Sequence, residues 1–193
     1  MDTVQAKLLK DMTSFLDSHK IPYMITGSWS SIYYGRPRAS HDIDFVVELP
    51  VENIENTTRL FSEIPETFII QLETIKAAIE NKNQFQAVHL PTMLKMDFWI
   101  LTDEQFDKVR FLRRKRIKLF NQFMQMATSE DTIIQKLIWF SKGQTEKHLV
   151  DAAFVLQIQR KNLDHKYLQS WIKKLKLVKE YKLIKEIDLE DYL

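Results

Sequence analysis

The sequence predicts an α+β fold, in which a small mixed β-sheet flanked by helices is followed by a C-terminal helical bundle. Short apolar or alternating segments of strand length punctuate the first hundred residues, with helical patterns between them. From about residue 103 onward the character becomes helical. The chain has 193 residues and no internal repeats. We therefore expect an α+β domain at residues 1–120 and a helical domain at 121–193 packed on it.

The front half is expected to alternate helices and strands. Apolar residues at helical spacing predict a helix over residues 2–19, which Pro22 stops soon after. The elements expected after it are a strand at Tyr23–Thr26, a helix at Trp29–Tyr34, a strand at 41–48 and a helix at 51–63.

Two alternating segments farther along predict a β-hairpin. They cover residues 85–90 and 94–101, and Pro91-Thr92-Met93 separates them. The second strand carries Asp97, with Lys95 and Trp99 expected on the same face because side chains alternate along a strand.

The rear half is expected to be helical. Ser129 suits a helix N-cap, Glu130 and Asp131 suit the first turn, and Gly143 suits the end of this helix. Further helices are expected at 145–160, around 167–175, and in the charged tail from residue 176.

Composition excludes several classes of function. The net charge of +2 means that nucleic-acid binding would depend on local clusters of charge. The chain has no cysteine, which excludes disulfides, thiolate metal sites and a cysteine nucleophile, and suits the cytoplasm, where we expect the protein. The N-terminus lacks the pattern of a signal peptide, and no apolar run approaches the roughly 18 residues of a membrane span.

Asp42 and Asp44 are the first candidate site residues. Spaced by one residue on a strand, they would stand side by side on one face. Two adjacent carboxylates flanked by apolar residues repel each other unless a cation lies between them, and a hard divalent cation, Mg²⁺ above all, is the usual solution. The alternative is a solvated acidic pair on an edge strand.

Gly27 and Ser28 follow a predicted strand and open a predicted helix. A helix N-terminus offers free N–H groups to a phosphate, glycine allows close approach, and the serine adds a hydroxyl donor. The alternative is an ordinary turn. Thirteen residues separate Ser28 from Asp42, which leaves room for one short helix and a return to the sheet.

Asp97 would be the third carboxylate. Together with Asp42 and Asp44 it could complete a site for two metal ions, and it could also serve as a general base. The alternative is a simple ion pair with Lys95.

This combination resembles the DNA polymerase β-like nucleotidyltransferase superfamily, and more closely the small prokaryotic nucleotidyltransferases related to abortive-infection and toxin–antitoxin toxins. The resemblance extends over most of residues 20–175. The motifs that carry it are the Gly27-Ser28 turn, Arg36-x-Arg38-x-Ser40-x-Asp42-Ile43-Asp44, Lys95-Met96-Asp97, and Ser129-Glu130-Asp131 with Lys136-Leu137 and Asp151.

The resemblance implies roles for particular residues. Residues 1–120 would be the catalytic domain, using two Mg²⁺ ions, with Mn²⁺ as an alternative, and an NTP, with ATP as the first candidate. The catalytic and metal-binding residues would be Asp42, Asp44 and Asp97, and the nucleotide-binding residues Gly27, Ser28, Arg36, Arg38 and Ser40. The two arginines could equally belong to a solvated turn.

A basic run lies between Lys108 and Lys118, with seven cations in eleven residues. It could bind RNA phosphates, or it could be a solvated face of an element that packs over the sheet. The residues expected to contact RNA are Arg110, Arg113, Arg114, Lys115 and Arg116. Nothing in the sequence points to DNA specifically.

Four residues of the rear half could form a polar cluster: Glu130, Lys136, His148 and Asp151. Lys136 could pair with Asp151 or reach the nucleotide.

These observations favour a Mg²⁺-dependent enzyme that moves a nucleoside monophosphate from an NTP to a hydroxyl acceptor and releases pyrophosphate. The acceptor could be an RNA end, a protein side chain or a small molecule, and the enzyme could be a toxin–antitoxin or phage-defence component with a cognate antitoxin. The alternatives are a catalytically inactive module that binds RNA or a protein partner, and a structural oligomer built through the C-terminal helices.

Overall fold

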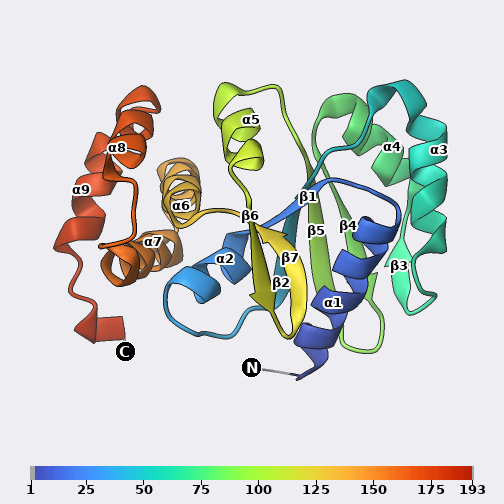
Figure 1. The fold of residues 1–193 in the computed structure, drawn as a ribbon, viewed down its shortest axis with the longest axis horizontal. Helices are drawn as coiled ribbons and strands as arrows, with labels where there is room; N and C mark the ends of the chain where they lie inside the picture. The colour runs from blue at the N-terminus through green and yellow to red at the C-terminus, as the bar shows by residue number, and fades with distance from the viewer. Residues whose placement is uncertain (1–2, 193) are drawn as a thin grey trace. The chain divides into compact units, whose positions relative to one another are not determined.

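Seven strands form one mixed β-sheet in residues 3–192, which the computed structural model describes (Figure 1). The strand order is β3-β4-β5-β2-β1-β7-β6. This arrangement, together with the helices below, confirms the predicted α+β class. The strands are β1 (Tyr23–Thr26), β2 (Asp42–Val47), β3 (Phe68–Ile70), β4 (Gln84–His89), β5 (Leu94–Ile100), β6 (Lys115–Leu119) and β7 (Gln122–Met126).

The pairing of the strands sets the positions of the acidic residues. β2 runs parallel to β5, with Asp44 opposite Asp97, and β1 runs parallel to β7. β4 and β5 pair antiparallel, which confirms the predicted hairpin. The pairs β3–β4 and β6–β7 are also antiparallel.

Aromatic side chains fill the core on one face of this sheet. The ring of Phe98 stacks between Phe45 and Phe85, with centroids 5.2 and 4.9 Å away. Phe61 packs edge-on against Phe85 at 5.1 Å. All four rings are buried, and each contributes about 1.5–3 kcal/mol through burial of its apolar surface. Because side chains alternate along a strand, the other face of β2 and β5 carries the polar residues.

The chain divides into two compact units. The sheet unit comprises the residues up to Ile25 and Ser40–Met126, and the helical unit comprises Thr26–Ala39 and the residues from Ala127 onward. The predicted division into domains at 1–120 and 121–193 stays a prediction. In the described residues the helices of the sheet unit are α1 (Thr3–Ser18), α3 (Ile54–Leu60), α4 (Leu72–Asn81) and α5 (Gln105–Leu112), with 3₁₀ turns η1 (Val51–Asn53) and η2 (Phe61–Glu63).

Helix α6 lies at the centre of the helical unit. It contacts α2, α7, α8 and α9, and its residues Ile133, Ile134 and Leu137 are fully buried. The helices of this unit are α2 (Gly27–Tyr34), α6 (Ser129–Gly143), α7 (Glu146–Gln159), α8 (His165–Lys174) and α9 (Val178–Glu186), followed by the 3₁₀ turn η3 (Glu190–Tyr192). Within residues 3–192, no helix combines the length and apolar character needed to cross a membrane.

The expectation of helix throughout the region after residue 103 is wrong. Only α5 is helical there before β6 and β7, which form a hairpin that buries Ile117, Met124 and Met126. Phe120 and Asn121 join these strands with φ values of 49° and 64°, the left-handed backbone that two-residue hairpin loops require. Three of the five residues of β6 are cations, which hides the strand pattern of this segment.

Smaller expectations are also corrected. The N-cap of α6 is Thr128 rather than Ser129, because the Thr128 side chain accepts the Asp131 backbone N–H. The helix expected at 51–63 is divided into η1, α3 and η2. Neither β3 nor α4 was expected. The start of the first helix was expected at Asp2, which lies outside the described residues.

Candidate active site

Three aspartates form a carboxylate row, Asp42, Asp44 and Asp97, on the polar face of the sheet unit. Asp42 and Asp44 alternate on β2 with the buried residues Ile43 and Phe45. Asp97 lies on β5 directly opposite Asp44 in the parallel register. The structure therefore brings three of the predicted site residues of this unit onto two neighbouring strands and one face.

The surroundings of Asp97 disfavour the ionised form of its carboxyl group. Its Oδ1 atom is buried and has no hydrogen-bond partner among the described residues. Burial raises the pKa of Asp97 above its ordinary value of 3.8, and the charge of Asp44 raises it further. A hydrogen bond from Gln86, directly opposite on β4, and the charge of Lys95 offset part of this rise. Lys95 and Gln86 thus compensate the Asp97 carboxylate only in part, and its Oδ1 atom could still accept a cation.

The donor set fits a hard divalent cation, because all three side chains offer carboxylate oxygens and Mg²⁺ prefers oxygen ligands. The unpartnered Oδ1 of Asp97 is a free ligand position. Across residues 3–192, however, no group of three or more His, Asp or Glu side chains already has its donor atoms arranged around a common point for a metal. The carboxylates would have to reorient on their strands to share an ion.

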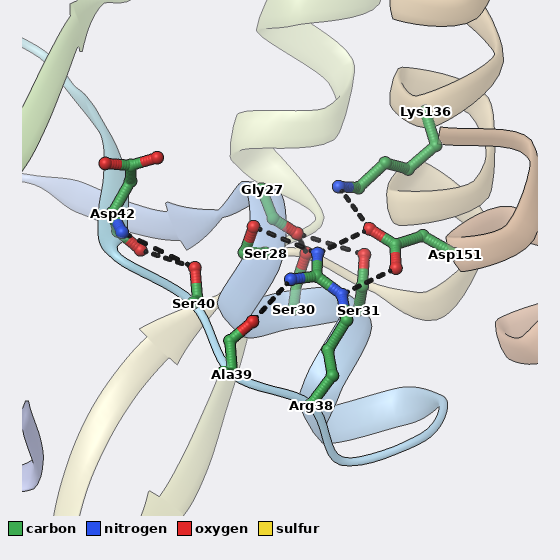
Figure 2. Close-up of polar contacts among 10 residues, drawn as sticks. All are labelled: Gly27, Ser28, Ser30, Ser31, Arg38, Ala39, Ser40, Asp42, Lys136 and Asp151. Atoms are coloured by element: carbon green, nitrogen blue, oxygen red, sulfur yellow. Dashed lines mark hydrogen bonds and ion pairs between the residues drawn. The ribbon is translucent and has the colours of Figure 1, made fainter. Parts of the chain in front are cut away.

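Ser40 lies just before β2 and has a local structural role. It is buried, and its hydroxyl donates to the backbone oxygen of Asp42 at 3.1 Å (Figure 2). Its own carbonyl accepts a hydrogen bond from Gln5 on α1. Ser40 therefore fixes the backbone at the start of the strand that carries the first two aspartates.

In the helical unit, the Gly27-Ser28 turn forms the first residues of α2. Gly27 has a φ of 63°, a left-handed conformation that favours glycine. Its carbonyl oxygen accepts hydrogen bonds from the hydroxyls of Ser30 and Ser31, at 3.1 and 3.0 Å. These contacts hold the turn at the N-terminus of the helix, the kind of position where phosphates bind in proteins.

Ser28 belongs to a buried polar network with Arg38, Lys136 and Asp151, which we call the Ser28 network (Figure 2). Arg38 donates to both carboxylate oxygens of Asp151, at 2.9 and 2.7 Å. The same guanidinium donates to Ser28 Oγ at 3.1 Å. Lys136 Nζ lies 2.7 Å from Asp151 Oδ2, which confirms the expected pairing. Two cations thus converge on one carboxylate.

Two cations hold the Asp151 carboxylate of the Ser28 network in its ionised form. Burial alone would raise the pKa of Asp151, but the hydrogen bonds from Arg38 and the charge of Lys136 outweigh it and lower the pKa. Asp151 is therefore ionised, and it pairs with both Arg38 and Lys136. Both Lys136 and Asp151 are at most 5% exposed, so this ion pair is poorly screened by water.

The remaining members of the predicted polar cluster behave differently. Glu130 accepts the backbone N–H of Asp164, the N-cap of α8, at 2.8 Å. His148 is neutral, because burial and then the charge of Lys136 lower its pKa to about 4.

Arg36 lies over the ring of Phe154, 4.5 Å from its centroid, and its buried Nε has no partner among the described residues.

Sequence reasoning did not predict that Arg38 pairs with Asp151. The two residues are 113 positions apart, so no local pattern connects them. The sequence alone predicts that Arg38 binds the nucleotide. It predicts that Lys136 either pairs with Asp151 or reaches the nucleotide.

The basic run is divided between α5, the following turn and β6. Arg110 is buried and bonded to Asp107 at 2.7 Å, so the expectation that it contacts RNA is not supported by its position. Arg114 donates to the Phe111 carbonyl, and Arg116 lies over the ring of Phe123. Lys115, Arg116 and Lys118 are exposed on β6, an edge strand of the sheet.

Three solved structures illustrate the similarity of this fold to known proteins. A crystal structure of ANT(2")-Ia with adenylyl-2"-tobramycin has a TM-score of 0.59 at 14% identity, over 93% of this chain and 99% of that one. An antigenic nucleotidyltransferase-like protein from Paracoccidioides brasiliensis has a TM-score of 0.56 at 14% identity, over 91% and 88%. The lincosamide antibiotic adenylyltransferase LnuA has a TM-score of 0.52 at 12% identity, over 79% and 96%.

A sequence model of one protein family matches residues 30–191. That family is described as "Nucleotidyl transferase AbiEii toxin, Type IV TA system". The match includes all three members of the carboxylate row, Arg38, Lys136 and Asp151, and begins after Gly27-Ser28. A comparison with curated proteins gave no match.

Proposed function

The chain belongs to the AbiEii nucleotidyl transferase toxin family, and from this premise we propose that it transfers a nucleoside monophosphate from an NTP to a hydroxyl acceptor. The observation that carries this proposal is the carboxylate row. Asp97 pairs with Asp44 in the parallel register of β2 and β5, so the two side chains lie next to each other on one face of the sheet. Charged groups that destabilise a fold persist where they serve a function, and this row has the composition needed for phosphoryl chemistry.

Asp97 would act as the general base of the transfer reaction. The acceptor hydroxyl would attack the α-phosphorus, forming a new P–O bond as the bond to the bridging oxygen of the β-phosphate breaks and pyrophosphate leaves. The proton of the hydroxyl would pass to the Asp97 carboxylate. A carboxylate whose pKa is raised by burial and by Asp44 is a stronger base than an ordinary aspartate.

Asp42, Asp44 and Asp97 would hold Mg²⁺, two ions in the arrangement we favour, with Mn²⁺ as an alternative. When bound, these ions would neutralise charge on the triphosphate and on the leaving pyrophosphate. The support is the all-oxygen donor set and the unpartnered Oδ1 of Asp97. ATP is the first NTP to test.

We assign phosphate contact to the Ser28 network. Gly27 and Ser28 are the first residues of helix α2, and the positive end of a helix dipole attracts phosphate. Arg38 would position Ser28 through its hydrogen bond to Ser28 Oγ, while Asp151 fixes the guanidinium. Arg36, with its unpartnered Nε, is the second candidate arginine for the triphosphate, and Ser40 supports the β2 backbone.

A toxin role with a cognate antitoxin follows from the family description, which names a type IV toxin–antitoxin system. Two proteins of the same fold are described with antibiotics, one as an adenylyl-tobramycin complex and one as a lincosamide adenylyltransferase. A small molecule therefore stands beside an RNA end and a protein side chain as a candidate acceptor. The cytoplasm stays the predicted location.

A second candidate function is a binding module without turnover. The observation that favours it is the edge strand β6, which exposes Lys115, Arg116 and Lys118 where RNA phosphates could bind. RNA binding through this strand would weaken steeply as salt is added.

The test is incubation of the protein with each α-³²P-labelled NTP and Mg²⁺, in the presence of host RNA, host protein or small-molecule extract. Label transferred by the wild type and lost in the Asp42→Ala/Asp44→Ala variant is expected. The matched control is Glu48→Gln, which removes an exposed carboxylate just after β2. Transfer that survives in the double aspartate variant would exclude the carboxylate row as the catalytic centre.

A further inference from the structure

A groove of about 460 Å³ lies in the sheet unit at the end of the sheet formed by β3 and β4. Its volume falls in the range of small-molecule sites. The side chains that matter for its chemistry are Ile69, Gln71, Thr74, Gln84, Gln86 and Val88.

The groove adjoins the carboxylate row through Gln86. This glutamine lines the groove, lies opposite Asp97 in the β4–β5 register and hydrogen-bonds its carboxylate. Gln84 and Val88, on the same strand and face, extend the wall in both directions, since side chains two residues apart share a face. Opposite Gln84 stands Trp99, whose buried indole N–H has no acceptor among the described residues. The groove therefore adjoins the residue that would accept the acceptor's proton.

The lining selects for an uncharged, hydrogen-bonding ligand. Three primary amides, from Gln71, Gln84 and Gln86, offer donors and acceptors, while Ile69 and Val88 supply apolar contact. None of the lining residues, all within the described chain, carries a charge. Lys95 is opposite Val88 in the strand register, but it is exposed and does not line the groove. Phosphate-bearing ligands depend on cationic contacts, so an RNA backbone is a poor fit here.

We propose that this groove is the acceptor subsite, and that it takes an uncharged polyhydroxyl compound, such as a sugar or cyclitol. This inference rests on the proposed function, because it concerns the same transfer reaction. The hydroxyl presented to Asp97 loses its proton to that carboxylate and forms a bond to the α-phosphorus of the NTP. Pyrophosphate leaves, and the product is a neutral polyol carrying one nucleoside monophosphate ester.

The test uses the full chain and a panel of neutral saccharides and cyclitols as probes. Binding is measured by saturation-transfer NMR, and transfer is measured with α-³²P-labelled NTP. The Gln71→Leu/Gln84→Leu variant keeps side-chain size but removes two amides from the groove. The matched control is Gln105→Leu, an exposed glutamine at the start of α5. Circular dichroism shows whether each variant is folded.

We expect at least one neutral polyol to bind and accept label. In the double groove variant, its half-saturating concentration should rise about tenfold or more, since two hydrogen bonds are lost, while that of the NTP stays unchanged. The control should match the wild type.

Two results would overturn the inference while leaving the proposed function intact. One is NTP binding with label passing only to RNA or protein. The other is failure of every neutral polyol to bind at millimolar concentration, or binding that the groove variant does not weaken. Absence of NTP binding in the wild type would instead reject the proposed function itself and the acceptor subsite with it.

Discussion

Asp44 and Asp97 lie directly opposite each other on the parallel strands β2 and β5. Neighbouring strands are about 4.8 Å apart, so two carboxylates at matched positions repel each other strongly when both are ionised. The raised pKa of Asp97, caused first by burial and then by Asp44, expresses that repulsion. Since Oδ1 of Asp97 has no partner among the described residues, the fold carries an electrostatic cost at this position.

Replacing Asp97 with asparagine should therefore separate stability from activity. Asp97→Asn removes the repulsion with Asp44 while retaining the side-chain shape. We expect the free energy of unfolding in metal-free buffer to rise by about 1 kcal/mol, or a few degrees in Tm, with loss of nucleotidyl transfer. Differential scanning calorimetry and the label-transfer assay measure the two effects. Destabilisation of the metal-free protein by this variant would contradict the view that Asp97 is strained.

The glycine at the start of α2 offers a second prediction. Gly27→Ala places a Cβ on a residue with a φ of 63°, which should cost about 1–2 kcal/mol and distort the Gly27-Ser28 turn. Gly143→Ala is the matched control, because a Cβ at this helix-terminal position would meet nothing nearer than Thr145 Oγ1, at 3.8 Å. Urea denaturation should show a loss of stability for the first variant and none for the second. Equal effects would argue against a strained turn.

Asp151 and Lys136 should be energetically coupled. Asp151→Leu leaves two cations without their shared carboxylate, which should cost about 3–5 kcal/mol. Adding Lys136→Met removes one of the two cations that contacted Asp151, so the double variant should lose less stability than the two single losses predict. A double-mutant cycle measured by denaturant unfolding checks this coupling. Strictly additive losses of stability would show that Asp151 and Lys136 act independently.

His148 should make the protein sensitive to mild acid. Its pKa is lowered to about 4 from 6.5, by burial first and by the charge of Lys136 second. Between these values the unfolded chain binds a proton that the folded chain does not, so stability falls as the pH falls from about 6.5 to 4. Because the ring is only partly buried, solvent screening should limit the loss to about 1 kcal/mol.

The His148→Gln variant should lose this part of the pH dependence, whereas His41→Gln, at an exposed position, should keep it. Unfolding free energies measured across the interval from pH 7 to pH 4 provide the comparison. Parallel stability curves for the wild type and His148→Gln would contradict the expectation.

The sequence allowed prediction of those features that local patterns determine. Alternation around Asp42 and Asp44, and around Asp97, placed these residues on strands of one sheet, and the β4–β5 hairpin is confirmed. The resemblance to toxin-related nucleotidyltransferases is confirmed by the family match over residues 30–191. The roles of individual site residues stay predictions.

Features that depend on distant contacts were not predicted. The pairing of Arg38 with Asp151 connects positions 113 residues apart, and only the packing of α2, α6 and α7 brings them together. The β6–β7 hairpin was not predicted because the exposed residues of β6 are basic and resemble a charged helix. The two left-handed residues of its turn, Phe120 and Asn121, gave only the weak signal of a single asparagine.

The most direct measurement of the central claim is Mg²⁺-dependent NTP binding by equilibrium dialysis, since it requires no knowledge of the acceptor. We expect the wild type and Glu48→Gln to bind the same NTP with equal affinity when Mg²⁺ is present. We expect Asp44→Asn to bind this NTP at least tenfold more weakly. Equal binding by all three proteins, or binding by the wild type that Mg²⁺ does not affect, would contradict a metal–nucleotide site on the carboxylate row.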